Sequence, residues 1–63
     1  MEYKIKELRE KRKLTQAQLA EKASVSRTII YRLENERNFD TSVSTLRKVA
    51  EALDVSVKSL FLP

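Results

Sequence analysis

Two arginines and a threonine share the outward face of an amphipathic segment at residues 27–35. Arg27, Thr28 and Arg32 lie opposite the apolar stripe that Ile30 and Leu33 form. An arginine can donate paired hydrogen bonds to guanine O6 and N7, and a threonine can offer its hydroxyl to a base or its methyl group to thymine. A helix with a donor-rich outer face and a buried inner stripe is the element that enters a DNA major groove. The residue types therefore predict base reading by these three side chains.

The neighbouring positions leave alternatives open. Only one of two adjacent residues can point squarely into a core, so with Ile30 inside we expect Ile29 to face partly outward, against a thymine methyl group. Tyr31 either rests on the DNA backbone or covers a neighbouring helix, and Arg32 takes either a second guanine or a phosphate. The alternative for the whole face is an ordinary solvated surface, since basic small proteins are common.

The local structure of residues 15–33 determines where these side chains lie. The stripe of Leu19, Ala20 and Ala23 predicts a helix over residues 16–23 that packs against the helix at 27–35. Thr15 suits the N-cap of the first helix, where Gln18 can complete a capping box, and Ser26 suits the N-cap of the second. With a polar break at Ser24, the pattern is that of a helix-turn-helix.

The rest of the chain also predicts helices, so the fold class is all-α. The expected elements are a first helix at residues 3–12 with Ile5 and Leu8 inside, a fourth from the N-cap Ser42 to about Leu53, and a short fifth that Ser56 caps. The basic cluster at residues 11–13 either complements the dipole of the first helix or contacts phosphates. The polar loop 36–41 carries one candidate for burial, Phe39.

Composition limits the possible functions of this 63-residue chain, which is short enough to be one domain, residues 1–63. It has no cysteine, histidine or glycine, which excludes thiolate or histidine metal sites, histidine-dependent catalytic triads and glycine-rich phosphate loops. The net charge of +4 fits a polyanionic partner. We expect no enzyme activity, cofactor, metal or small-molecule ligand. No apolar run approaches the ~20 residues of a membrane span, and no signal peptide is evident, so we expect a cytoplasmic, nucleoid-associated protein.

Four stretches in this order resemble the phage-repressor/Cro-like helix-turn-helix family, the XRE family. They are IKELREKRKLTQAQLAEK, the VSR that opens the helix at residues 27–35, the YRLEN at its end, and STLRKVAEALDVSVKSLF. The resemblance covers nearly the whole chain. It implies a compact five-helix, lambda-repressor-like domain that binds double-stranded operator DNA, usually as a homodimer on a palindrome, and regulates transcription as a repressor.

The resemblance also implies roles for individual residues. Base reading falls to Arg27, Thr28 and Arg32, to which we add Ile29. Gln16 opens the second helix where the family contacts a phosphate. Ser26 and Asn35 lie where the family contacts the DNA backbone. We add Tyr31, and the loop residues Arg37 and Asn38, as further candidates for backbone contacts. Arg9 and Glu34 stand where the family forms an ion pair between the first and third helices.

The chain departs from the family pattern at three places. Ser24 and Glu36 replace two glycines, and the loop before the fourth helix is one residue longer and lacks a proline. If Ser24 has a left-handed backbone, it is strained relative to glycine by roughly 1 kcal/mol or more. The longer loop puts the contacts of Arg37 and Asn38 in doubt.

The C-terminal segment is the candidate dimer surface. It carries more apolar side chains than so small a monomer can bury, namely Val57, Leu60, Phe61 and Leu62. Leu60 and Phe61 serve equally well to close the core. A second functional hypothesis is an antitoxin-like or other protein-interaction module that binds DNA together with a partner protein.

Overall fold

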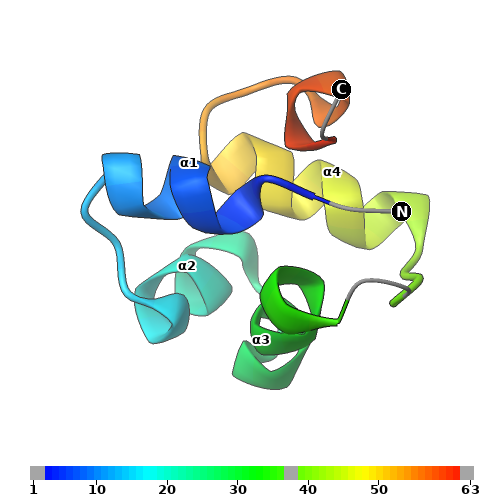
Figure 1. The fold of residues 1–63 in the computed structure, drawn as a ribbon, viewed down its shortest axis with the longest axis horizontal. Coiled ribbons are helices and arrows are strands. Elements are labelled where there is room, and N and C mark those ends of the chain that lie inside the picture. Colours follow the sequence, from blue (N-terminus) through cyan, green and yellow to red (C-terminus); the bar gives the residue numbers. More distant parts are fainter. Residues whose placement is uncertain (1–2, 37–38, 62–63) are drawn as a thin grey trace.

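The computed structural model describes residues 3–36 and 39–61, which fold as a small helical bundle measuring 23 × 20 × 19 Å. The elements are α1 (Ile5–Lys11), α2 (Gln16–Ala23), α3 (Arg27–Asn35), α4 (Val43–Ala52) and a 3-10 helix, η1 (Val57–Leu60). Helices α2 and α3 lie together on one side of the molecule, and η1 lies on the opposite side (Figure 1). The described residues contain no strand, so the all-α prediction is confirmed.

The count of five helices is not confirmed. The predicted fifth helix is a single 3-10 turn of four residues, and α1 is shorter at both ends than residues 3–12. The start of α1 and the end of η1 lie beside a contact between the two ends of the described chain. Tyr3 and Phe61 form an isolated antiparallel bridge, and the Lys4 N–H donates to the Leu60 carbonyl at 2.7 Å. Phe61 has an extended backbone and follows the last residue of η1, whereas the other end of α1, at Lys11, lies away from this contact.

The bridge between the chain ends is also a side-chain contact. The rings of Tyr3 and Phe61 pack with their centroids 5.3 Å apart. Burial, together with the nearby Asp40 carboxylate, raises the pKa of the Tyr3 hydroxyl. Two segments that are far apart in the sequence thereby close one side of the core.

Most of the helices have a hydroxyl side chain at the N-cap, as the sequence predicts. Thr15 and Gln18 form a complete capping box: Thr15 Oγ1 accepts from the Gln18 N–H at 3.0 Å, and the Thr15 N–H donates to Gln18 Oε1 at 2.8 Å. The hydroxyls of three serines accept the equivalent bond at α3, α4 and η1, namely Ser26, Ser42 and Ser56. These bonds satisfy amides that a helix leaves free at its N-terminus.

One core holds the helices together. Its fully buried large side chains come from every element and from the end of α4: Ile5, Leu19, Ile30, Leu53, Leu60 and Val49. The inner stripes predicted for α2 and α3 are buried, which confirms the helical periodicity on which they rested. Leu8, Leu14 and Phe39 pack against this core while partly exposed.

Ser24 has the left-handed backbone that the helix-turn-helix requires, with φ 58° and ψ 40°. Lys13 and Asp54 adopt the same region, with φ of 57° and 58°. Glu36 does not: the chain leaves α3 through an extended residue with φ −106° and ψ 108°. The replacement of glycine therefore strains the backbone at Ser24 but not at Glu36.

Arg12 has a structural role that the sequence analysis did not assign to it. Its Nε donates to the Leu53 carbonyl, and its Nη2 lies 3.5 Å from the Asp54 carbonyl oxygen. A cation at the C-terminal end of α4 satisfies free carbonyls and complements the helix dipole. The basic cluster at residues 11–13 thus contributes one side chain that holds α4 against α1.

Ser24→Gly should stabilise the domain, because glycine adopts the left-handed region without the Cβ clash. We expect the free energy of unfolding to rise by about 0.5–1 kcal/mol, after allowance for the extra freedom that glycine gives the unfolded chain. In thermal denaturation this corresponds to a rise in Tm of about 2–8 °C. Ala17→Gly, on the exposed face of α2, is the control and should lower Tm. An unchanged or lower Tm for Ser24→Gly would contradict the strain.

Arg12→Met should lower the free energy of unfolding by about 1 kcal/mol, since it leaves the carbonyls at the end of α4 without their cationic donor. The control variant is Lys11→Met, at the exposed neighbouring residue. It removes the same charge and should change the free energy of unfolding by less than about 0.5 kcal/mol. Urea denaturation followed by circular dichroism measures both. Equal effects of the two variants would show that charge, and not the cap, is responsible.

Candidate nucleic-acid interface

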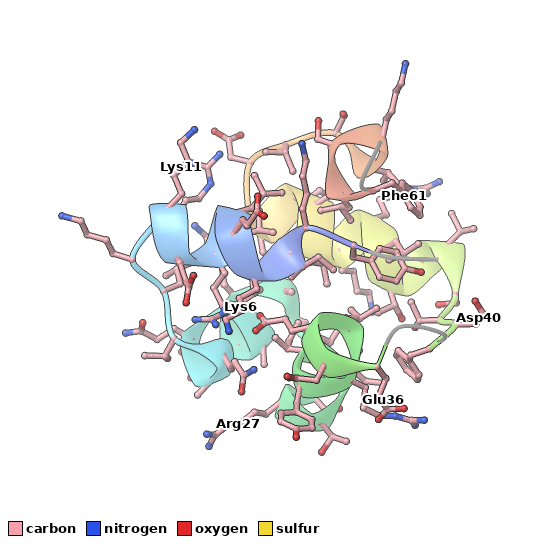
Figure 2. All side chains as sticks on the ribbon, viewed as in Figure 1. Lys6, Lys11, Arg27, Glu36, Asp40 and Phe61 are labelled. Carbon is pink, nitrogen blue, oxygen red and sulfur yellow. The ribbon has the colours of Figure 1, made fainter. Side chains whose placement is uncertain are left out.

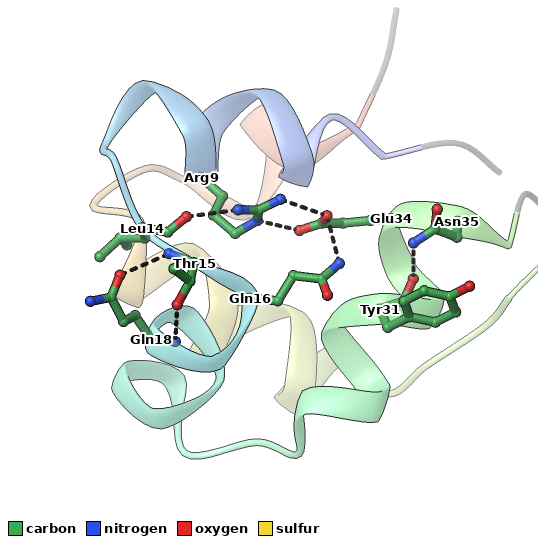
Figure 3. A network of polar contacts seen from close by, with 8 residues as sticks. All are labelled: Arg9, Leu14, Thr15, Gln16, Gln18, Tyr31, Glu34 and Asn35. Atoms are coloured by element: carbon green, nitrogen blue, oxygen red, sulfur yellow. Dashed lines mark hydrogen bonds and ion pairs between the residues drawn. The ribbon is translucent and has the colours of Figure 1, made fainter.

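A largely buried ion pair joins α1 to α3. Arg9 on α1 donates through Nε to Glu34 Oε2 at 2.7 Å and through Nη2 to Glu34 Oε1 at 3.1 Å. The side chain of Glu34 is only 1% exposed and that of Arg9 11%. The ion pair that the family resemblance implied is therefore present, with two-point geometry, as Figure 3 shows.

Two further hydrogen bonds complete this network. Arg9 Nη1 donates to the Leu14 carbonyl at 2.7 Å, and Gln16 Nε2 donates to Glu34 Oε1 at 3.1 Å. Glu34 thus accepts from both α1 and α2 (Figure 3). No buried side-chain nitrogen or oxygen within residues 3–36 and 39–61 lacks a partner. Full satisfaction is what allows buried charges to be tolerated.

Arg9 keeps its positive charge under ordinary conditions. The hydrogen bond to Glu34 is the main cause of a raised Arg9 pKa; burial opposes the rise, and the charges of Glu34 and Glu10 add to it. A raised folded-state pKa contributes stability that is lost only as the pH rises through it. Because arginine titrates far above neutral pH, this contribution is constant under ordinary conditions.

The network fixes how the start of α2 meets α3. Gln16 is the first residue of α2, and its side-chain amide nitrogen carries a second N–H besides the one given to Glu34. The amide is held between the two helices and can still donate outward. The sequence analysis predicted Gln16 as a phosphate contact but did not find its bond to Glu34, which only the tertiary structure creates.

Four of the predicted contact residues border one hollow. It measures about 360 Å³ and is lined by Gln16, Arg27, Thr28 and Tyr31. Arg27 extends away from the body of the molecule on the side where α3 lies (Figure 2). Tyr31 is 54% exposed, which favours the outward alternative over packing on a neighbouring helix. The hollow is therefore bordered by hydrogen-bond donors from both helices.

Three other predicted contacts have local roles. Ser26 Oγ accepts from the Ile29 N–H at 3.1 Å, which leaves its own O–H free to donate outward. The Asn35 amide donates to the Tyr31 carbonyl at 2.9 Å at the end of α3 (Figure 3). Ile29 is half-buried and packs against the core, which favours a packing role over the predicted base contact.

Arg32 is engaged in a way that the sequence analysis did not consider. Its Nε and Nη2 donate to the two carboxylate oxygens of Glu36, at 2.9 and 3.2 Å, and its guanidinium carbon lies 4.2 Å from the centre of the Phe39 ring. The spacing of four residues between Arg32 and Glu36 was the available signal, because such side chains are neighbours on a helix.

The candidate dimer residues divide between core and surface. Leu60 is 0% exposed, so it belongs to the core and offers no surface to a second copy. Val57 and Phe61 are half-buried. Leu62, like the predicted backbone contacts Arg37 and Asn38, lies outside the described residues.

Other kinds of site find no support among residues 3–36 and 39–61. They contain no group of three or more carboxylate, histidine or cysteine side chains that could hold a metal ion. None of their helices has the length and apolar character that crossing a bilayer demands.

Comparison with known proteins identifies relatives of this chain. A family model described as Helix-turn-helix (HTH_3) matches residues 5–60. The immunity repressor protein of Bacillus phage phi105 is 47% identical over 57 residues, which are 90% of this chain and 39% of that protein. The chain thus spans about two fifths of the length of this curated relative.

Two solved structures share the fold with a TM-score of 0.81 and 34% sequence identity over 87% of this chain. One is the crystal structure of SinR, a master regulator for biofilm formation, in complex with DNA, and the match covers 87% of that chain. The other is a complex of the SinR and SinI proteins, where the match covers 53% of the chain.

Arg9→Met should destabilise the domain by about 3–5 kcal/mol, because it leaves the Glu34 carboxylate buried without its cation. Urea denaturation followed by circular dichroism gives this value. The double variant Arg9→Met/Glu34→Leu is the control: with both charges removed, much of the lost stability should return. A loss below about 1 kcal/mol for Arg9→Met would show that the pair behaves as an exposed one.

Proposed function

The chain belongs to the helix-turn-helix family, within its phage-repressor and Cro-like branch, and we propose that it binds specific double-stranded DNA sequences and represses transcription. One observation carries the proposal: donors from the start of α2 and from the outer face of α3 border a single hollow. The two helices that build the hollow are joined by the hydrogen bond from Gln16 to Glu34, and Glu34 is held in turn by its ion pair with Arg9 on α1. The phage immunity repressor and the DNA-bound SinR structure support it.

Docking would begin at the sugar-phosphate backbone. The N-terminal end of α2 presents amides and the positive end of its dipole, which together attract a phosphate. Gln16 adds its outward N–H, and the hydroxyls of Ser26 and Tyr31 add donors on either side. Asn35 would extend these contacts at the far end of α3. Such contacts set the register of the protein on the duplex but carry no sequence information.

Base reading would then fall to the first turn of α3. Arg27 and Thr28 are both exposed there, on the face that borders the hollow. Residues near the N-terminus of the recognition helix are the ones that reach base edges in this motif. The Arg27 guanidinium suits guanine O6 and N7, and Thr28 suits an adjacent base or a thymine methyl group.

The operator would be a palindrome that a homodimer binds. A domain 23 Å in its longest dimension covers about one half-site. Two copies related by a two-fold axis place their recognition helices about 34 Å apart, one turn of the duplex. We assign the dimer contact to the surface around η1, where Val57 and Phe61 stay half-exposed, and the site of action to the cytoplasm, where operator DNA is accessible.

A second candidate is a module that binds DNA together with a different partner protein. The solved complex of SinR with SinI favours it, because a structural relative there associates with another protein. In this alternative, the chain would bind a specific DNA sequence only in complex with its partner protein.

Selection of bound duplexes from a random DNA pool, at about 150 mM salt to suppress general phosphate binding, tests the proposal. We expect an enriched palindrome. An enriched single half-site would retain the DNA reader and remove the dimer. Enrichment only after addition of a partner protein would favour the second candidate, and no sequence preference at all would reject the regulator.

Arg27→Ala should weaken binding to the selected duplex by about 1–3 kcal/mol and relax preference at one base pair of each half-site. Titration of labelled duplexes that differ at single positions measures both effects. Arg47→Ala, an exposed arginine on α4, is the matched control for lost charge and should leave base preference unchanged. If Arg27→Ala weakens all sequences equally, Arg27 contacts a phosphate instead of a base.

A further inference from the structure

Arg32 lies on the outward face of α3, and contacts with neighbouring residues hold its side chain in place. Two groups hold it: the Glu36 carboxylate binds its Nε and Nη2, and the Phe39 ring covers one face of its guanidinium. Arg32 and Glu36 are about equally exposed, at 45% and 46%. A simple ion pair this exposed is held only loosely. Two-point hydrogen bonding and a stacked ring restrict this one far more.

Phe39 can serve as a platform because it is anchored itself. It packs against the hydrophobic core, and its N–H donates to the Glu36 carbonyl at 3.2 Å. This hydrogen bond joins Phe39 to Glu36, the extended residue through which the chain leaves α3. The ring and the carboxylate therefore meet the guanidinium from two directions.

The remaining donors of Arg32 form the edge that suits a guanine. A guanidinium has five N–H donors in a rigid plane, and Glu36 takes those of the Nε–Nη2 side. Among residues 3–36 and 39–61, Nη1 has no hydrogen-bond partner, so the Nη1–Nη2 edge can still donate. Two parallel N–H groups on one edge match O6 and N7 of guanine.

We propose that Glu36 and Phe39 are positioning residues that fix Arg32 for reading a second guanine, farther along α3 from the base that Arg27 reads. This rests on the proposed function, since it assigns a specificity device to the same DNA face. Glu36 and Arg27 both extend on the side of the molecule where α3 lies (Figure 2). A fixed side chain loses less freedom on binding, so the correct base is favoured.

The carboxylate also discourages the wrong contact. A free arginine at the end of α3 could swing onto any phosphate, which would strengthen binding to every sequence. Pairing with Glu36 offsets its charge and adds a repulsive group for a phosphate at that place. Specificity often comes from such a repulsive element as well as from an attractive one.

Binding of the selected duplex, and of duplexes changed at each base pair, tests this with purified variants that remain folded by circular dichroism. Arg32→Ala should locate the base pair, with discrimination there falling about 5- to 150-fold. Glu36→Gln should lower discrimination at the same base pair by about 2- to 12-fold. It should also tighten binding to an unrelated duplex. Glu51→Gln makes the same charge change on the exposed surface of α4 and should leave that base preference unchanged.

Substitutions at Phe39 separate positioning from simple packing. Phe39→Tyr keeps the ring face and should keep the preference, whereas Phe39→Leu keeps an apolar side chain in the core and should lose part of it. The proposal is overturned if Arg32→Ala leaves every base preference intact, or if Glu36→Gln changes Tm but no preference. A wild-type chain that selects no sequence would instead reject the proposed function itself.

Discussion

The fold depends on a carboxylate that is almost completely withdrawn from water. Glu34 ties α3 to α1 through Arg9 and to α2 through Gln16, so one side chain sets the positions of three helices. Burying such a charge is unfavourable unless it is paired and hydrogen-bonded, and Glu34 accepts two bonds from Arg9 and one from Gln16. Because hydrogen bonds require specific distances and angles, these bonds restrict how α2 and α3 lie relative to each other, and with them the donors that border the hollow.

Stability in so small a domain is thin, which gives weight to each local feature. A chain of about 60 residues buries only about 60% of the surface that its unfolded form exposes. With no cysteine to form a disulfide, the domain relies on helix caps, on Arg12 at the end of α4, and on the bridge between Tyr3 and Phe61. Ser24 works against these, because its left-handed backbone is strained in any residue but glycine.

The surface contacts of Arg32 show where reasoning from single residues stops. Its outward position on α3 was predicted from helical spacing, and the same spacing could have indicated its pairing with Glu36. The Phe39 ring could not be placed in this way, since its position depends on how the loop returns across the end of α3. Ile29 was expected to face partly outward beside the buried Ile30, and it is half-buried and packs against the core.

The sequence by itself determined the all-α class, the bounds of α2 and α3, the capping residues and the buried stripes, because each follows from local periodicity and hydrogen bonding within a few residues. Only the tertiary structure decided the bond between Gln16 and Glu34, the cap that Arg12 places on α4, the burial of Leu60, and the 3-10 form of η1. These join residues distant in the chain, and no spacing rule encodes a contact whose geometry exists only once the helices have packed.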